Sequence, residues 1–418
     1  MTVSAAKTPP GAAPTPSYLP IILAASIILA LSFGARSIFG VVLAPLSSDL
    51  GWPRETFALS LALQNLIWGL GQPFFGAVAD RIGDRKALWI GLLCYLAGML
   101  ISAVGTAPWM QHLGVGFFVG LGTAGTAFGL VLAAVGRAVP EAKRSRALAL
   151  VAALGASGQV LMPLLAQAIE ASQGWQLAIA ATGALLLLAA FAIPFMRAPA
   201  SGLPRLDPDP MGVALANALR QPSYVLLNLG FFVCGFHVAF ISAHFPAYVA
   251  EVCRAFTLMD RTVSPEALGA ATLSITGAAN IAGTLLAGEL GARYPKPYVL
   301  SGIYALRALL ILAFLALPAT PASVIAFSAL MGILWLSTVP LTSALVATMF
   351  GPRNLATLSG VVFLSHQLGS FLGVWMGGRF YDLYGSYDTV WMVAIGLGIF
   401  SAIVHLPISE RRLDAAPA

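Results

Sequence analysis

Two arginines lie inside long apolar segments of the chain, where no aspartate or glutamate accompanies them. These are Arg36 and Arg307. A charge at the centre of a bilayer costs about 2.5–3.5 kcal/mol on insertion scales, and arginine cannot lose its proton to avoid that cost. A bound carboxylate is the simplest group that would neutralise each guanidinium. The alternatives are an arginine that extends toward the membrane surface and one that binds the carbonyl groups of a neighbouring helix.

Three histidines in apolar segments are candidates for moving a proton. His237 and His244 are seven residues apart and therefore share one face of a helix. His366 lies in the middle of a later segment, next to Gln367. Because no acidic residue is buried with them, histidine is the natural proton carrier near neutral pH. The alternative is a neutral histidine that is hydrogen-bonded within a helical bundle.

Side-chain amides complete the set of residues that could contact a ligand. Asn65 follows Gln64 in the second apolar segment, and Asn280 lies in the eighth. Polar groups on one face of an apolar helix should face a cavity or a neighbouring helix, not lipid. Hydrogen bonds between helices are an equally good interpretation of each one. The predicted substrate-binding residues are Arg36, Asn65, His237, Asn280, Arg307, His366 and Gln367, and the predicted proton-coupling residues are His366, His237 and His244.

The composition requires that these residues be held in a membrane. Of the 418 residues, 59% are hydrophobic and only 9% are charged, whereas about a quarter are charged in ordinary soluble domains. This balance excludes a soluble enzyme, a nucleic-acid-binding protein and a disordered chain. The sequence contains no Walker loop and no Cys/His cluster with the spacing of metal ligands. We therefore expect neither an enzyme nor a bound cofactor or metal, and we expect lipid as the surrounding solvent.

The apolar residues form segments of the length that crosses a bilayer, about 20 residues. A proline-rich stretch, 197–222, separates the first six from the last six, and its prolines disfavour a regular element. Pro163 and Pro340 are candidates for bending the fifth and tenth segments. The twelve predicted spans are 18–46, 55–79, 87–105, 111–136, 145–169, 175–196, 223–250, 266–288, 298–318, 323–349, 356–378 and 389–408.

The basic residues predict how the chain is oriented. With both termini and the even-numbered loops on one side, most of the 22 basic residues fall on that side. The positive-inside rule then predicts that both termini are cytoplasmic in a plasma (inner) membrane protein, which we expect to be a monomer. The predicted organisation is a disordered cytoplasmic tail over 1–17, a six-helix bundle over 18–196, a cytoplasmic linker over 197–222, a second six-helix bundle over 223–408 and a cytoplasmic tail over 409–418.

A loop motif is repeated about half the chain apart. The segment Gly76-Ala77-Val78-Ala79-Asp80-Arg81-Ile82-Gly83-Asp84-Arg85-Lys86 has a degraded copy in 288–296. The first copy resembles the signature loop of the major facilitator superfamily. That resemblance implies an all-α polytopic fold of twelve transmembrane helices in two pseudo-symmetric six-helix bundles, with a binding site between them. It also implies a cytoplasmic gate formed by Gly76, Asp80, Arg81, Gly83 and Arg85, although a loop that only caps two helices would show the same motif.

A narrower resemblance lies in the first, fifth and seventh spans. The segments 33–40 (FGARSIFG), 143–149 (KRSRALA) and 235–246 (GFHVAFISAHFP) are similar to the monocarboxylate porter and oxalate/formate antiporter branch. A cation in the first helix is a feature of that branch, and Arg36 occupies the matching position. The branch commonly carries a charged residue in its eighth helix, where this chain has Asn280 and Thr284.

The function expected from these features is secondary transport of small organic anions, most simply monocarboxylates. The co-substrate would be a proton, in symport, or a second anion, in exchange. The alternative is a carrier of the same fold that exports a larger neutral or anionic amphipathic compound. A sensor or receptor would need an appended signalling domain, for which the short tails leave no room.

Overall fold

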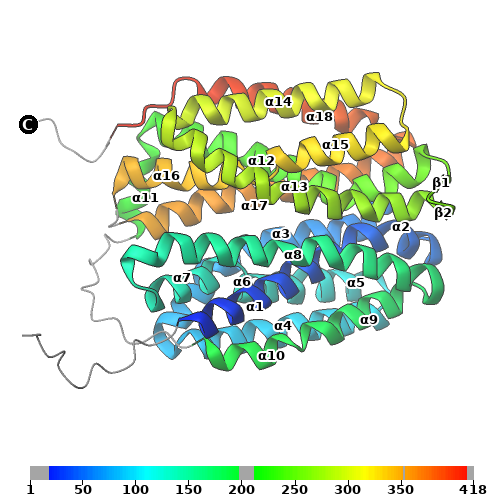
Figure 1. The fold of residues 1–418 in the computed structure, drawn as a ribbon, viewed down its shortest axis with the longest axis horizontal. Helices are drawn as coiled ribbons and strands as arrows, with labels where there is room; N and C mark the ends of the chain where they lie inside the picture. The colour runs from blue at the N-terminus through cyan, green and yellow to red at the C-terminus, as the bar shows by residue number, and fades with distance from the viewer. Residues whose placement is uncertain (1–17, 197–210, 352–353, 412–418) are drawn as a thin grey trace, which may run out of the picture.

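The computed structural model describes residues 18–196, 211–351 and 354–411, and nearly all of them are helical (Figure 1). The predicted tail 1–17 and the first part of the linker, 197–210, lie outside the described residues. In the first half the elements are α1 (Leu19–Ser37), α2 (Phe39–Asp49), α3 (Arg54–Ile82), α4 (Asp84–Val104), α5 (Pro108–Gln111), η1 (His112–Val119), α6 (Gly120–Thr126), α7 (Phe128–Ala138), α8 (Glu141–Gln173), α9 (Trp175–Leu186), α10 (Ala189–Ala192) and η2 (Ile193–Phe195).

The second half begins after the linker. Its elements are α11 (Met211–Leu219), α12 (Pro222–Val252), β1 (Phe256–Leu258), β2 (Arg261–Val263), α13 (Pro265–Arg293), α14 (Lys296–Ala316), α15 (Pro321–Leu334), α16 (Thr338–Phe350), α17 (Leu355–Tyr384) and α18 (Asp388–His405).

The helices confirm the prediction of an all-α polytopic membrane fold. Within the described residues, eleven helical segments are long and apolar enough to cross a membrane. The remaining predicted span is α3, which is 29 residues long. It is more polar than the others because it carries Gln64, Asn65 and Gln72 along its length.

Several predicted spans are built from two or more consecutive helices. The first is divided at Ile38 between α1 and α2, and the fourth is divided at Ala127 between α6 and α7. The tenth is divided between α15 and α16, close to Pro340. Pro163, by contrast, lies inside the uninterrupted helix α8, so it does not divide that span.

Two short elements differ from the sequence-based expectation. Part of the proline-rich linker forms α11, because the segment after Pro210 contains no proline until Pro222 and consists largely of good helix formers. The loop after α12 forms a hairpin in which Leu258 pairs with Arg261. Its turn residues Met259 and Asp260 both have positive φ, which is the geometry of a tight two-residue hairpin turn.

The two halves lie side by side (Figure 1). Each has its own main hydrophobic core, and Ala239, Ala243 and Val374 of the second half join the core of the first. Across the boundary α3 packs along α17, α8 along α13 and α2 against α12. Some of these contacts are close enough to require glycine, which has no side chain. A Cβ on Gly40 of α2 would overlap the carbonyl oxygen of Ser242 on α12. We call the end where α1 begins and α18 ends the near end, and the opposite end, which carries the β1–β2 hairpin, the far end.

Candidate functional site

A cavity of about 40 Å³ lies between the two halves. A water molecule needs at least about 10–15 Å³ measured this way, so the cavity is small. Its wall comes from both halves of the chain: Phe33, Arg36, Ser37, Phe39, Gly40, Leu61, Gln64, Asn65 and Gln159 from the first, and Ala239, Ser242, Ala243, Leu273, Thr276, Gly277, Trp335 and Val374 from the second.

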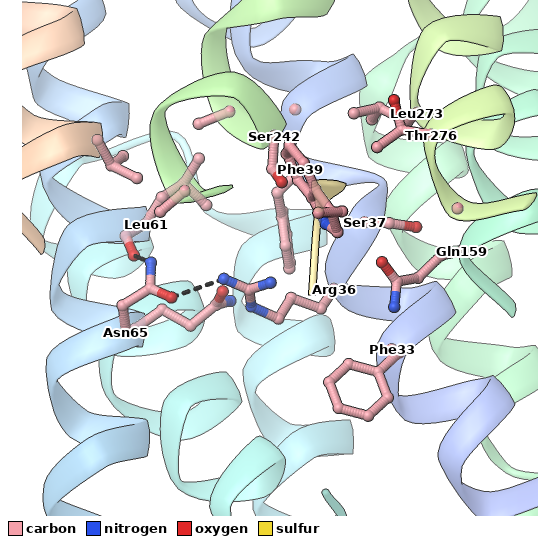
Figure 2. A pocket seen from close by; sticks show the side chains of 17 residues that line it. Phe33, Arg36, Ser37, Phe39, Leu61, Asn65, Gln159, Ser242, Leu273 and Thr276 are labelled. Carbon is pink, nitrogen blue, oxygen red and sulfur yellow. Dashed lines mark hydrogen bonds between the residues drawn. The ribbon is translucent and has the colours of Figure 1, made fainter. Parts of the chain in front are cut away.

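Arg36 supplies the charge of this cavity. It belongs to the last turn of α1, immediately before the interruption at Ile38. Its Nη2 donates a hydrogen bond of 2.6 Å to Oδ1 of Asn65 (Figure 2). Asn65 is itself oriented by a 2.8 Å bond from its Nδ2 to the carbonyl oxygen of Leu61. The guanidinium carbon lies 5.2 Å from the ring centroid of Trp68, within the range of a cation–π contact.

Two buried donors in the cavity wall have no hydrogen-bond partner among the described residues. They are Nε of Arg36 and Nε2 of Gln64. A buried donor without a partner costs about 1–3 kcal/mol, and more for a charged group. Of the lining residues that the structure describes, Arg36 is the only charged one. The arrangement is therefore suited to an anion that accepts hydrogen bonds.

Arg307, which gave the same signal in the sequence, is in a different environment. Its side chain is fully buried and is not among the residues that line the cavity. Nε donates to the carbonyl oxygen of Leu334 at 3.1 Å, and Nη2 donates to the same oxygen at 2.5 Å and to the carbonyl oxygen of Trp335. Helix-end carbonyls thus compensate this charge, which was one of the two sequence-based alternatives.

Two of the three predicted histidines bind backbone carbonyls of the second half, and the third contacts a side chain there. His237 Nε2 is 2.8 Å from the carbonyl oxygen of Ala394, and His244 Nε2 is 2.8 Å from that of Val374. His366 Nδ1 is 3.2 Å from Oε1 of Gln367. None of these three histidines belongs to the described cavity wall.

The two remaining predicted ligands also lie outside the wall. Asn280 accepts a 3.0 Å hydrogen bond from the backbone N–H of Leu336. Gln367 is fully buried, and its Cβ lies where a side chain on Gly69 of α3 would be. Of the predicted binding residues, the structure therefore brings only Arg36 and Asn65 together at the cavity.

The cavity also contains residues that were not selected from the sequence. Gln159 of α8 projects from the first half, and Ser242 of α12 comes from the second. A glutamine in an otherwise apolar run such as α8 is a signal that could have identified Gln159. Ser242 gave no such signal, because serine is common in transmembrane helices as a helix-packing residue.

The predicted cytoplasmic gate lies at the near end. Gly83 ends α3 with φ +91°, a conformation that favours glycine, and the Cβ position of Gly76 is open. Arg81 and Arg85 are exposed. The side chain of Asp80 lies outside the described residues.

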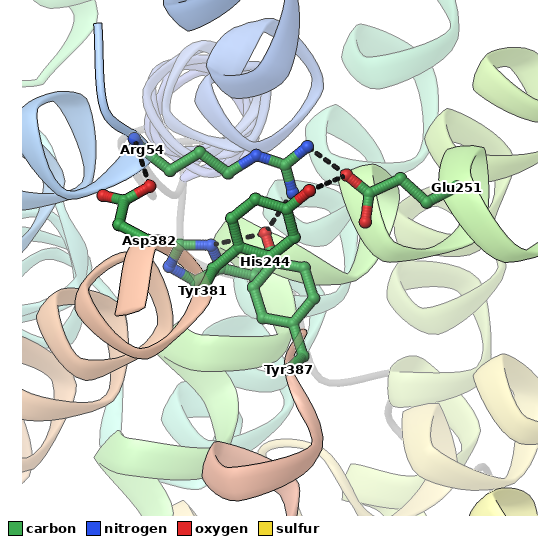
Figure 3. Close-up of polar contacts among 6 residues, drawn as sticks. All are labelled: Arg54, His244, Glu251, Tyr381, Asp382 and Tyr387. Carbon is green, nitrogen blue, oxygen red and sulfur yellow. Dashed lines mark hydrogen bonds and ion pairs between the residues drawn. The ribbon is translucent and has the colours of Figure 1, made fainter. Parts of the chain in front are cut away.

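At the far end, polar side chains join the two halves (Figure 3). Arg54 at the start of α3 forms an ion pair with Glu251 of α12, and its Nη1 donates to the hydroxyl of Tyr387 at 2.7 Å. Its guanidinium carbon lies 3.7 Å from the ring centroid of Tyr381, whose hydroxyl donates to Glu251 at 2.8 Å. We call Arg54, Glu251, Tyr381, Asp382 and Tyr387 the far-end latch.

Asp382 contributes to this latch through the backbone. Its two carboxylate oxygens accept hydrogen bonds from the backbone N–H groups of Arg54 at 3.0 Å and Glu55 at 2.7 Å. The first N–H groups of a helix have no partner within it, and a negative charge there is stabilising. Helix α3 of the first half is therefore capped by a carboxylate of the second half.

A bundle of membrane-spanning helices in two halves, with a polar cavity between them, defines a polytopic membrane carrier. The sequence profile of the Major Facilitator Superfamily matches residues 25–255 and 255–417, so the chain belongs to this superfamily. It is accordingly a multi-pass membrane transporter of small molecules, a class of proteins that are generally not enzymes.

Individual relatives cover different shares of the chain. The uncharacterised transporter YcxA of Bacillus subtilis (strain 168) is 24% identical over 382 residues, which are 89% of this chain and 90% of that one. The putative niacin/nicotinamide transporter NiaP of the same organism is 38% identical over 115 residues, 27% of this chain and 28% of NiaP. A crystal structure of the nucleoside transporter NupG superposes with a TM-score of 0.73 at 14% identity, covering 93% of this chain and 99% of NupG. The last similarity concerns the fold alone.

Proposed function

We propose that this transporter is a secondary carrier of small organic anions, and that monocarboxylates are its substrates. The observation that carries the proposal is the unpartnered Nε of Arg36 in a cavity between the halves. One carboxylate oxygen would accept a hydrogen bond from this Nε, and the Nε2 group of Gln64 offers a second donor. Hydrogen bonds to charged groups contribute about 1.5–3 kcal/mol each.

Two similarities support a carboxylate in particular. Segments around Arg36 and in α12 resemble the monocarboxylate porter and oxalate/formate antiporter branch. NiaP is described as a putative niacin/nicotinamide transporter; niacin is a pyridine carboxylic acid, and nicotinamide is its neutral amide. A carboxylate is planar, and a guanidinium binds it in a forked geometry.

The proposed mechanism is alternating access around Arg36. The six-helix halves, 18–196 and 223–408, would rock against each other so that the cavity opens to one side at a time. The cavity of about 40 Å³ holds only a few water molecules, so substrate entry requires the halves to separate. Entry from the far end requires the far-end latch to break.

Charge compensation suggests how transport is coupled. A carrier that returns empty would move Arg36 without a counter-charge, which is costly in a low-dielectric interior. Anion exchange avoids that state because a second anion occupies the site on the return step, whereas in proton symport the empty carrier bears this cost; we propose one of these two modes. His366, His237 and His244 remain the candidates for holding the proton in symport.

The orientation is proposed from the charge of the near end. Arg81 lies in the last turn of α3, and Arg85 and Lys86 lie in the first turn of α4 at that end. Arg137 forms an ion pair of 2.5 Å with Asp84 there. By the positive-inside rule, the near end and both termini would face the cytoplasm of a cell whose inner membrane holds the protein. We propose a monomer as the working unit.

The experiment is uptake of labelled C2 to C6 monocarboxylates and nicotinate into proteoliposomes. We expect Arg36→Gln to lower uptake efficiency by about 10- to 100-fold, the loss of one charge-assisted hydrogen-bonding group. Arg293→Gln is the matched control, because Arg293 pairs with Glu289 on the exposed surface of one helix. Equal uptake by Arg36→Gln and the parent protein would contradict the proposed role of Arg36. Saturable uptake of neutral compounds with no carboxylate uptake would contradict the substrate class.

A further inference from the structure

The tenth predicted span is interrupted at the level of the cavity. Helix α15 ends at Leu334, Trp335 has φ −57° and ψ −80°, and α16 begins at Thr338. The sequence explains the interruption, because Pro340 has no N–H to offer the carbonyl of Leu336 four residues earlier and its ring crowds that group. The last carbonyls of α15 therefore need partners from elsewhere.

Side chains from two other helices bind the backbone at the interruption, and one of them supplies the donors for these carbonyls. Arg307 of α14 donates to the carbonyl oxygens of Leu334 and Trp335. Asn280 of α13 accepts from the N–H of Leu336 at 3.0 Å. The negative end of the helix dipole of α15 also favours a cation at this position. The interruption is thus held from two sides by residues that do not line the cavity.

Arg307 is fixed in turn by groups around it. Its Nη1 lies 3.5 Å from Sγ of Cys234, which is 3.1 Å from Oγ1 of Thr338 on α16. Its guanidinium carbon lies 5.2 Å from the ring centroid of Tyr304, one helical turn earlier on α14. Arg307 therefore connects α14, α12 and both pieces of the interrupted span.

The residue held by this arrangement is part of the cavity wall. Trp335 lines the cavity together with Arg36, and only 4% of its surface is exposed. We propose that Arg307 is a positioning residue: it fixes the backbone at Leu334–Trp335, places the Trp335 side chain in the wall, and thereby limits the size of the apolar part of the substrate. The proposal rests on the proposed function and narrows the substrate class to carboxylates with a short apolar body.

Positioning and direct binding by Arg307 predict different results. If Arg307 bound the substrate carboxylate, its removal would weaken transport of all acids alike, because every substrate carries that group. If it positions Trp335, its removal changes the preference between short and long acids. It also loosens the backbone near Trp335 when no substrate is present.

The first measurement is hydrogen–deuterium exchange of the purified, substrate-free protein, in the peptide that contains Leu334–Thr338. We expect exchange there to be about tenfold faster in Arg307→Met, equivalent to about 1.4 kcal/mol of lost local stability. Arg307→Lys keeps the charge but loses the forked guanidinium, so its exchange rate should lie between those of Arg307→Met and the parent protein. It also allows the measurement to be made if Arg307→Met fails to fold. Arg293→Met is the control. Unchanged exchange in both Arg307 variants would overturn the proposal.

The second measurement is the ratio of KM for a C6 and a C3 monocarboxylate in proteoliposomes. We expect Arg307→Lys and Trp335→Ala to shift this ratio in the same direction by about threefold or more, and the double variant to shift it by less than the two shifts multiplied. An equal loss for both acids would make Arg307 a substrate ligand and overturn the proposal. If the parent protein transports no carboxylate, the proposed function fails, and the exchange measurement still decides whether Arg307 holds the interruption.

Discussion

Replacing Arg54 by glutamine should shift the protein toward a state that is open at the far end. The substitution keeps a polar side chain and removes one of the charges that join the halves; the ion pair of Arg379 with Glu55 remains. It eliminates the ion pair with Glu251, the charge-assisted hydrogen bond to Tyr387 and the cation–π contact with Tyr381. The backbone hydrogen bonds from residues 54 and 55 to Asp382 should persist, so α3 keeps its cap.

The expected magnitude follows from the exposure of these groups. The side chain of Arg54 is 14% exposed and that of Glu251 35%, so the pair is partly screened and contributes less than about 1 kcal/mol. The cation–π contact adds about 0.5–1 kcal/mol, and the hydrogen bond to Tyr387 adds about 1 kcal/mol beyond what glutamine retains. A total of about 2 kcal/mol changes the ratio of open to closed protein by about 30-fold.

The assay is a distance distribution between spin labels at the far end of each half. Thr106→Cys in the first half and Met259→Cys in the hairpin of the second half are both exposed positions. Cys94 and Cys253 are replaced by serine, whereas Cys234 is kept because it is fully buried and contacts Arg307. We expect Arg54→Gln to increase the population with the longer distance.

Arg293→Gln is the matched control for this measurement. It removes Arg293, whose side chain is 69% exposed and pairs with Glu289, 59% exposed, on the same helix. It should therefore leave the distance distribution unchanged. Identical distributions for Arg54→Gln and the parent protein would refute the reasoning, because the latch would then contribute nothing to closure. A shift of equal size in Arg293→Gln would mean that net charge, not the latch, controls the equilibrium.

Two further predictions use the same labels. Gly40→Ala places a Cβ against the carbonyl oxygen of Ser242, so it should disfavour the closed contact of α2 with α12 by about 1–3 kcal/mol. Gly396→Ala is the control, because the Cβ position of Gly396 is open, and it should leave the distance distribution unchanged. Equal distributions for the two variants would contradict the role of this contact. Tyr387→Phe should open the far end about fivefold, because of the two contacts of its hydroxyl, with Arg54 and His244, the one with Arg54 joins the halves. Because burial raises the pKa of the Tyr387 phenol above its usual 10.0, the hydroxyl stays protonated and its contribution is lost only as pH rises above that value. The effect of Tyr387→Phe should therefore be constant between about pH 6 and 9, and a dependence on pH in that range would contradict it.

The sequence predicted the spans well because bilayer thickness imposes their length. The predicted span 145–169, for example, lies within α8, Glu141–Gln173. Interruptions were harder to predict. The one near Pro340 had a local cause that the sequence displayed. The interruption between α1 and α2 at Ile38 has no proline at that position to indicate it. The nearby contact of Gly40 with α12 joins segments far apart in the sequence, so only the three-dimensional structure shows it.

The candidate site was predictable only in part. Arg36 and Arg307 gave the same signal, a cation without an acid in an apolar run, yet one lines the cavity and the other binds backbone carbonyls. The difference depends on which helices surround each arginine, and hydrophobic periodicity within a single helix does not contain that information. The histidines illustrate the same limit, because the carbonyls that bind His237 and His244 come from α18 and α17.

The position of Arg307 has a consequence for how the protein is made. Its acceptors at Leu334 and Trp335 are 27 and 28 residues later in the chain, so Arg307 emerges from the ribosome before the groups that stabilise its charge. During synthesis, this helix must wait beside the translocon or enter lipid with an uncompensated guanidinium, at a cost of about 2.5–3.5 kcal/mol. We therefore expect stable insertion of α14 to be completed together with α15 and α16, as one unit of biogenesis.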